Sequence, residues 1–281
     1  MRLASFRREG RSRFGLVTRT GIVDLADRLP GASSLRELCA LGVESAARYV
    51  DDPADVDIGS VVWEPVVPDP EQILCIGLNY RAHAAEVGRP PSERPAVFLR
   101  TRQSQTAHLG PLIRPRASEE FDYEGELAVI VGAPGRRIDR ADAFDHIAGY
   151  ALYNDASARD WQRHSHQYTP GKNFPSTGAL GPWLTTADEV PDPREIRIST
   201  RVNGVLVQES GIDDLIFTIP EIIEYLSMFT ELRPGDVIPT GTPSGVGSMR
   251  VPPLWLRPGD VVEVEGTGLG TLVNPVVEEA F

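Results

Sequence analysis

Residues 202–205 read Val-Asn-Gly-Val and lie between two segments in which apolar and polar residues alternate. Asn-Gly favours a two-residue hairpin turn, because both residues adopt positive φ at little cost. Two copies of Leu-Arg-Pro-Gly-Asp-Val, at 232–237 and 256–261, each predict a Pro-Gly turn that leads into a strand. Two copies are too few for a stacked repeat protein. With 26 glycines and 24 prolines among 281 residues, these turns predict a β-rich fold rather than a helix bundle.

A proline-rich segment at residues 64–72 has the composition of a linker. Before it, residues 14–18 and 21–25 have the pattern of short strands, and residues 35–49 have that of a helix. After it, Thr218 and Glu221 form a capping-box pattern, followed by apolar residues at helical spacing up to Phe229. We therefore predict a mixed α/β (α+β) chain with a small N-terminal α/β domain at 1–66 and a larger domain at 67–281.

The charge balance excludes several classes of partner. The chain has 28 basic and 40 acidic side chains, a formal net charge of -12, so we expect neither nucleic acid nor an anionic membrane as a partner. The N-terminus lacks the apolar segment of a signal peptide and no apolar run is long enough to span a bilayer, which predicts a cytoplasmic protein. Cys39 and Cys75 are outside any Cys-x-x-Cys pair, which excludes thiolate zinc sites and predicts reduced core residues.

Lys172 is the only lysine, and every other basic residue counted with it is an arginine. An ammonium group on a flexible stem is not replaceable by a planar guanidinium where geometry matters. Lys172 is therefore a candidate functional residue, although chance retention would leave the same pattern.

Three acids alternate at the start of a segment with the composition of a buried strand, residues 121–132. On a strand Asp122, Glu124 and Glu126 would share one face, where their like charges repel unless a cation or solvent intervenes. A solvated sheet edge is one interpretation. A further acid, Asp155, ends another apolar stretch. Carboxylate oxygens of this kind suit a hard cation such as Mg²⁺ as ligands.

His83 and Glu86 are three residues apart in a predicted short helix, so they share one helical face. A carboxylate beside an imidazole orients it and raises its basicity, which is the arrangement of a general base for water. An ordinary surface ion pair has the same spacing. The glycine-rich segments at 239–247 and 266–270 match neither a Walker phosphate loop nor a dinucleotide-binding fingerprint.

Five motifs in this order resemble the fumarylacetoacetate hydrolase family over residues 70–278. They are GLNYRAHAAE (77–86), DYEGELAVIVG (122–132), NDASARDWQ (154–162), GKNF (171–174) and RPGDVIPTGTPSGVG (233–247). The resemblance implies a mixed β-roll catalytic domain behind a small N-terminal domain, a homodimer, and a divalent cation, Mg²⁺ or Mn²⁺, in the roll.

The resemblance also implies roles for individual residues. Glu124, Glu126 and Asp155 match the metal ligands, whereas Asp122 has no ligand counterpart. Lys172 matches a lysine beside the substrate oxyanion, and His83 with Glu86 matches a water-activating dyad on a mobile lid. The positions that match the substrate-binding end of the site are Arg159, Gln162, Thr242 and Tyr80.

Two segments depart from the family pattern. Phe98-Leu99-Arg100-Thr101 stands where relatives commonly carry Phe-x-Lys-Pro, and residues 163–170 differ from many members near the expected substrate mouth. His164 and His166 are interpreted as loop or pocket wall rather than as a metal pair.

These residues predict a Mg²⁺-dependent hydrolase that cleaves a carbon-carbon bond in an acylpyruvate or related β-diketone, substrates typical of aromatic-compound catabolism. The metal would hold the enolate that forms when the bond breaks. The same parts also suit an oxaloacetate-type decarboxylase or an isomerase or hydratase of 2-hydroxy-diene-dioates. A 2-oxo acid sensor without turnover, and acids that form only surface networks, are the other interpretations.

Overall fold

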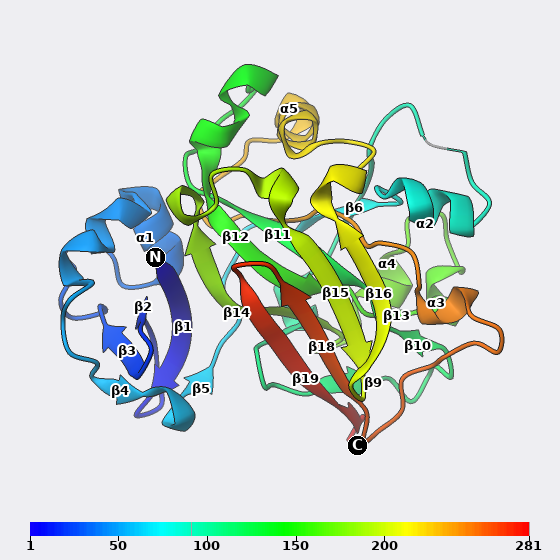
Figure 1. The fold of residues 1–281 in the computed structure, drawn as a ribbon, viewed down its shortest axis with the longest axis horizontal. Coiled ribbons are helices and arrows are strands. Elements are labelled where there is room, and N and C mark those ends of the chain that lie inside the picture. Colours follow the sequence, from blue (N-terminus) through cyan, green and yellow to red (C-terminus); the bar gives the residue numbers. More distant parts are fainter. Residues whose placement is uncertain (91, 281) are drawn as a thin grey trace.

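The computed structural model describes residues 1–90 and 92–280. Short helices connect long strands (Figure 1). The α-helices are α1 Leu35–Leu41, α2 Arg81–Glu86, α3 Arg159–Gln162, α4 Thr169–Lys172 and α5 Ile219–Phe229. The 3-10 helices are η1 Val43–Tyr49, η2 Ile58–Ser60, η3 Arg102–Ser104, η4 Arg140–His146, η5 Ala187–Glu189, η6 Pro193–Glu195, η7 Ile212–Asp214 and η8 Gly247–Met249.

Ten strands form the largest sheet, and eight of them follow the order β17-β11-β12-β14-β1-β2-β3-β4. Their bounds are β17 Val237–Pro239, β11 Gly125–Val131, β12 Ile147–Asn154, β14 Gly178–Thr186, β1 Arg2–Arg8, β2 Arg11–Val17, β3 Gly21–Asp24 and β4 Val56–Asp57. Strand β5 (Val62–Trp63) pairs with β1, and β8 (Gln105–Thr106) pairs with β14. All seven residues of β11 are buried, which explains its unbroken apolar sequence.

A second sheet packs against the centre of the first (Figure 1). Its order is β16-β15-β18-β19-β9, with bounds β16 Val205–Gly211, β15 Arg197–Val202, β18 Val261–Gly266, β19 Gly270–Glu278 and β9 Leu112–Arg114. Two strand pairs complete the fold: β6 Leu74–Gly77 with β7 Ala96–Leu99, and β10 Phe121–Asp122 with β13 Ser157–Ala158. Gly125 lies where the sheets approach closely, since a Cβ there would come within 2.0 Å of Thr200 Oγ1.

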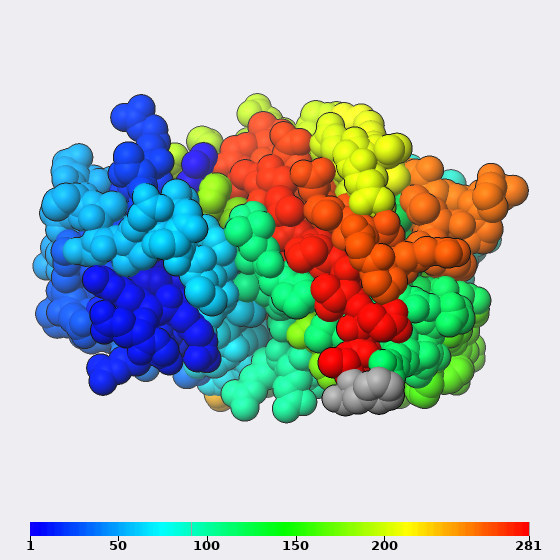
Figure 2. Space-filling view, turned by 90° about the horizontal axis from the view of Figure 1, so that it is seen from below, coloured from blue at the N-terminus to red at the C-terminus, as the bar shows by residue number. Residues whose placement is uncertain are grey.

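The first 66 residues lie at one end of the molecule (Figure 2). Their strand β1 pairs antiparallel with β14, with Leu3 opposite Leu184, so the large sheet runs from this segment into the rest of the chain. Leu3, Phe14 and Leu35 share one core cluster with Leu180 and Leu184. The division into domains at 66/67 remains a prediction, but both segments contribute to a common sheet and core.

Several local predictions are confirmed. Asn203 and Gly204 connect β15 to β16 with φ of 53° and 77°. The first residues of β17 and β18 are Val237 and Val261, which end the two hexapeptides. Thr218 and Glu221 form both hydrogen bonds of the capping box on α5. Both cysteines are free and buried.

Two predicted elements are shorter than expected. The helical pattern at 35–49 becomes α1 followed by the 3-10 helix η1, because Gly42 between them has φ of 98°. The predicted strand at 121–132 is interrupted between β10 and β11, so Asp122 is separated from the face that carries Glu124 and Glu126. In the described part of the chain no helix is long and apolar enough to cross a membrane.

Candidate active site

A cavity of about 550 Å³ lies beside the start of β11 and the end of β12. Its lining includes residues from each of the five motifs that resemble the family. The ionisable side chains that line it are His83, Arg89, Glu124, Glu126, Asp155, Arg159, Arg163, His164, His166, Tyr168 and Lys172.

Three carboxylates meet at one side of this cavity. Glu124, Glu126 and Asp155 are buried, and one oxygen of each lies within 4.8 Å of the others. The β11–β12 register places them together, because Gly125 pairs with Asn154 and the backbone N–H of Asp155 donates to the carbonyl of Glu124 at 2.8 Å. Asp122 is not a member of this group.

The electrostatics of Glu126 fit a divalent cation. Burial, together with the charges of Asp155 and Glu124, raises the pKa of Glu126 well above its usual range. The backbone N–H of Gly241 donates to its Oε2 at 2.9 Å, and no arginine or lysine pairs with it among the described residues. A hard divalent cation held by Glu124, Glu126 and Asp155 would remove this repulsion, and carboxylate oxygens are the donors such ions prefer.

Lys172 is buried beside two of the three carboxylates. Its Nζ donates to Glu124 Oε2 at 2.7 Å, to Asp155 Oδ2 at 2.6 Å and to the Asp155 carbonyl at 3.1 Å. Burial alone would lower the pKa of Lys172, but Asp155 and Glu124 outweigh burial and raise it. The ammonium group is therefore charged, and Lys172 lines the cavity.

Arg100 is a site residue to which the sequence assigned no role. Its side chain is fully buried, Nη1 pairs with Asp155 Oδ1, and Nη2 donates to Thr177 Oγ1 at 2.7 Å. The position stood out only as an arginine where relatives commonly have lysine. Its partner Asp155 is 55 residues away, so no local pattern could reveal the pairing.

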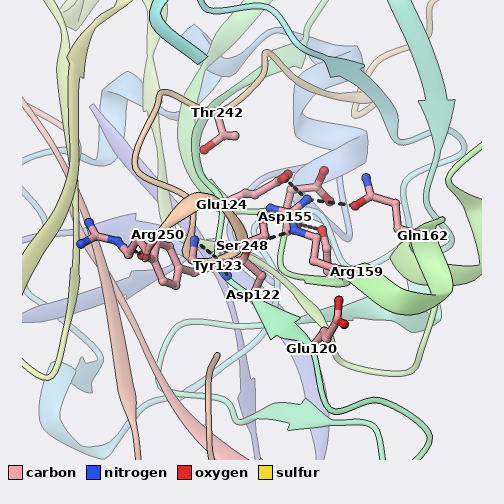
Figure 3. A network of polar contacts seen from close by, with 12 residues as sticks. Glu120, Asp122, Tyr123, Glu124, Asp155, Arg159, Gln162, Thr242, Ser248 and Arg250 are labelled. Carbon is pink, nitrogen blue, oxygen red and sulfur yellow. Dashed lines mark hydrogen bonds and ion pairs between the residues drawn. The ribbon is translucent and has the colours of Figure 1, made fainter. Parts of the chain in front are cut away.

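Arg159 and Gln162 lie together on α3 and both line the cavity. Arg159 Nη1 pairs with Glu124 Oε1 at 2.6 Å and donates to Gln162 Oε1 at 3.0 Å (Figure 3). Burial alone would raise the pKa of Glu124, but the positive charges of Arg159 and Lys172 outweigh burial and lower it. Arg159 Nη2 is buried and has no protein partner in the described chain, which leaves a donor for a bound acceptor.

His83 and Glu86 form the expected pair on α2. His83 Nδ1 and Glu86 Oε2 are 2.9 Å apart, and Glu86 Oε1 accepts from the backbone N–H of Gly245 at 2.9 Å. Because a carboxylate accepts, it favours the tautomer with the proton on Nδ1 and leaves Nε2 free as a base. His83 is buried and lines the same cavity as the three carboxylates.

The remaining predicted site residues divide into two groups. Thr242 lines the cavity, and its Oγ1 donates to the Gly125 carbonyl at 3.0 Å. His164 and His166 line the cavity mouth as wall residues and belong to no metal-binding group in the part of the chain described.

Tyr80, the last of the predicted substrate contacts, lies in the core. Its side chain has no exposed surface and packs in the core cluster instead of lining the cavity. Tyr80 is the residue before α2, and its role as a substrate contact stays a prediction.

Comparisons with known sequences identify the relatives of this chain. A family model described as fumarylacetoacetate (FAA) hydrolase C-terminal matches residues 72–277. Oxaloacetate tautomerase fahd2 of Xenopus laevis is 43% identical over 213 residues, 75% of this chain and 67% of the relative. Oxaloacetate tautomerase YisK of Bacillus subtilis is 42% identical over 242 residues, 82% of this chain and 80% of the relative.

Solved structures give the same result for the fold. Fumarylacetoacetate hydrolase from Exiguobacterium antarcticum is 31% identical with a TM-score of 0.85, and the match covers 99% of this chain and 100% of that one. Maleylpyruvate hydrolase from Sphingobium, in complex with manganese and pyruvate, is 28% identical with a TM-score of 0.84 over the full length of both chains. The expected β-roll architecture is thus confirmed, and the chain belongs to the fumarylacetoacetate hydrolase family.

Proposed function

We propose that this protein is a divalent-metal-dependent enzyme that acts on a 2-oxo acid through its enolate. The observation that carries the proposal is the meeting of His83, Lys172 and the Glu124–Glu126–Asp155 group in one cavity. The cation, Mg²⁺ or Mn²⁺, would be held by the three carboxylates and would polarise the 2-oxo group. The manganese and pyruvate complex of the maleylpyruvate hydrolase relative supports this assignment.

The chain's own residues account for the other requirements of enolate chemistry. The free Nη2 of Arg159 would bind the substrate carboxylate, and Lys172 would stabilise negative charge on the enolate oxygen. His83 Nε2, oriented by Glu86, would accept and return a proton.

Two reactions use these parts, and we propose keto-enol tautomerisation of an oxaloacetate-like acid as the first. Its support is the naming of the 42–43% identical relatives as oxaloacetate tautomerases. In this reaction His83 would move a proton to or from the carbon beside the carbonyl.

Hydrolysis of a carbon-carbon bond in an acylpyruvate, the reaction predicted from the sequence, is the second candidate. Here His83 would take a proton from the water that attacks the distal carbonyl. The maleylpyruvate hydrolase relative shares the whole fold and supports this reaction.

An assay of metal-stripped protein against oxaloacetate and a panel of acylpyruvates, with and without Mg²⁺ or Mn²⁺, tests the proposal. Ultraviolet absorbance follows enol and diketone, and mass spectrometry follows products. Metal-dependent loss of enol without a mass change identifies a tautomerase, acid plus pyruvate a hydrolase, and carbon dioxide a decarboxylase. Metal-dependent ligand binding without turnover would identify a sensor and contradict the proposal.

The His83→Ala substitution tests the proposed base. We expect the rate to fall by about 10²- to 10⁴-fold, because a positioned general base typically contributes that much. Metal affinity, measured by calorimetry, should remain that of the wild type, since His83 is outside the carboxylate group. His146→Ala is the matched control, because His146 bonds the Ala133 carbonyl outside the cavity. Wild-type turnover by His83→Ala would remove the dyad from the mechanism.

A further inference from the structure

Asp122 is a fully buried carboxylate that accepts four hydrogen bonds. Its Oδ1 accepts from the backbone N–H groups of Tyr123 at 2.9 Å and Gly247 at 2.7 Å. Its Oδ2 accepts from the backbone N–H of Ser248 at 3.0 Å and from Arg159 Nε at 2.8 Å. Both oxygens are therefore fully used, which leaves none for a metal ion.

This carboxylate stands behind the cavity rather than in it. Asp122 is not a lining residue, whereas its partners Arg159 and Ser248 are (Figure 3). The glycine-rich segment 239–247 approaches Asp122 closely at its last residue, Gly247. A Cβ on Gly247 would come within 2.6 Å of Asp122 Oδ1 and 2.0 Å of the Leu254 carbonyl. Asp122 thus connects β10, the start of α3 and the start of η8.

The donors of Arg159 divide into two sets. Nε is bonded to Asp122, and Nη1 to Glu124 and Gln162. Nη2 is buried without a protein partner in the part of the chain that the structure describes. A guanidinium is planar and rigid, so fixing Nε and Nη1 also fixes the direction of the two Nη2 hydrogens. Arg159 lines the cavity, and Nη2 is the nitrogen of this fixed guanidinium that keeps its donors for a ligand.

We propose that Asp122 is a positioning residue that holds the Arg159 guanidinium so that Nη2 binds the carboxylate of the substrate. The inference rests on the proposed function, because it requires a carboxylate ligand in this cavity. It assigns a role to the one acid of residues 122–126 that takes no part in the carboxylate group. Burial alone would lower the pKa of Arg159, but the charges of Glu124 and Asp122 outweigh burial and raise it.

The test is calorimetric titration of the Mg²⁺-loaded protein with oxalate, a small dicarboxylate with the shape of a pyruvate enolate. Asp122→Asn replaces one carboxylate oxygen, which accepts hydrogen bonds, with an NH2 group. This group would face the N–H donors that Asp122 normally accepts from. Oxalate affinity should fall by about 10- to 100-fold, since misplacing a charged hydrogen-bond donor costs binding, while Mg²⁺ affinity should change by less than about threefold. The matched control is Asp160→Asn, because Asp160 is the neighbouring acid and bonds Ser118 instead of Arg159.

A double-mutant cycle shows whether Asp122 acts through Arg159. If it does, Asp122→Asn should add nothing to the oxalate defect of Arg159→Met. Additive losses, or wild-type oxalate affinity in Asp122→Asn, would overturn the inference while leaving the proposed function intact. Failure of the wild-type protein to bind oxalate with Mg²⁺ would overturn both.

If Asp122→Asn does not fold, NMR of the wild-type guanidinium groups gives the answer, with Arg159 assigned from Arg159→Lys. The Nε–H of Arg159 should exchange slowly with and without oxalate, and oxalate should shift only the Nη signals. An Nε–H that exchanges rapidly in the free protein would contradict a guanidinium held by Asp122.

Discussion

The buried acidic and basic side chains of the site nearly cancel in charge, and the remaining charge suits the binding of a cation together with an anion. Four buried carboxylates face three buried basic groups: Asp122, Glu124, Glu126 and Asp155 against Arg100, Arg159 and Lys172. One carboxylate is therefore in excess. A divalent cation would convert this into an excess of one positive charge, which matches the carboxylate of a 2-oxo acid. The net charge of -12 of the whole chain has little effect on this buried group of charges, because salt screens distant surface charges.

Lys172 provides the sharpest test at the residue scale. Its Nζ donates to Glu124 and twice to Asp155 and lies 5.0 Å from the centre of the Phe98 ring, contacts that a longer, planar guanidinium would not reproduce. Lys172→Arg keeps the charge but should lower kcat by about 10²- to 10³-fold, the typical cost of a lost oxyanion donor. Steady-state kinetics measures this, with the exposed Arg102→Lys as control. A kcat within a few-fold of the wild type would show that charge alone suffices.

Residues whose partners lie within one motif could be predicted from the sequence. His83 with Glu86, and Glu124 with Glu126, are close along the chain, and the order of the motifs joined them to Asp155 and Lys172. Asp122 and Arg100 could not be assigned in this way. Asp122 is 37 residues from Arg159 and 125 from Gly247, and such contacts depend on how β10, α3 and the glycine-rich loop pack in three dimensions.

At the scale of elements, two very short helices carry most of the cationic side of the site. α3 bears Arg159 and Gln162, and α4 ends at Lys172. Four-residue helices are not stable alone, so their positions depend on packing against each other. Gly171 permits this contact, because a Cβ there would lie 2.4 Å from the Gln162 backbone nitrogen and 2.5 Å from the Ala158 carbonyl.

Gly171→Ala should therefore separate α4 from α3. The two atoms that the new Cβ would meet, Gln162 N and Ala158 O, belong to the backbone, so the clash can be removed only if one of the helices moves. We expect a loss of about 1–3 kcal/mol in unfolding free energy, the usual cost of overpacking, together with reduced oxalate affinity. Urea unfolding and calorimetry measure the two effects. The control is Gly59→Ala, where the nearest atom is the flexible Asp57 Oδ1 at 3.1 Å. Equal stability of the two variants would show that the α3–α4 contact adapts.

At the scale of the whole molecule, an aromatic contact joins the first 66 residues to the β-roll. The Trp63 ring meets His108 edge-on at 5.3 Å and lies 6.4 Å from the Trp183 ring. His108 Nδ1 accepts from the backbone N–H of Val273 at 3.1 Å, which ties the same imidazole to β19. The proline-rich linker composition predicted a boundary at this point. The linker composition could not show that β1 belongs to the large sheet, because β1 pairs with residues 183 positions away and local composition carries no information on such pairing.

His108 makes this junction sensitive to acid. Burial lowers the pKa of His108 to about 4 in the folded chain, whereas an unfolded histidine titrates near about 6.5. Between these two pKa values the unfolded chain binds more protons than the folded chain. The stability that His108 contributes is therefore fully present above the unfolded pKa and is lost as the pH falls toward the folded pKa. The loss attributable to this group is at most about 1.4 kcal/mol per pH unit.

His108→Asn should remove this dependence, because the asparagine Oδ1 can still accept from the Val273 N–H and does not gain a proton. We expect the unfolding free energy of the variant, measured by urea denaturation, to fall less steeply than that of the wild type between about pH 6.5 and 4, the interval set by the two pKa values. Above that interval the two curves should run parallel. The change in tryptophan fluorescence on acidification should also shrink, since the Trp63 ring contacts His108. Parallel curves over the whole interval would mean that His108 is not the group through which acid weakens this junction.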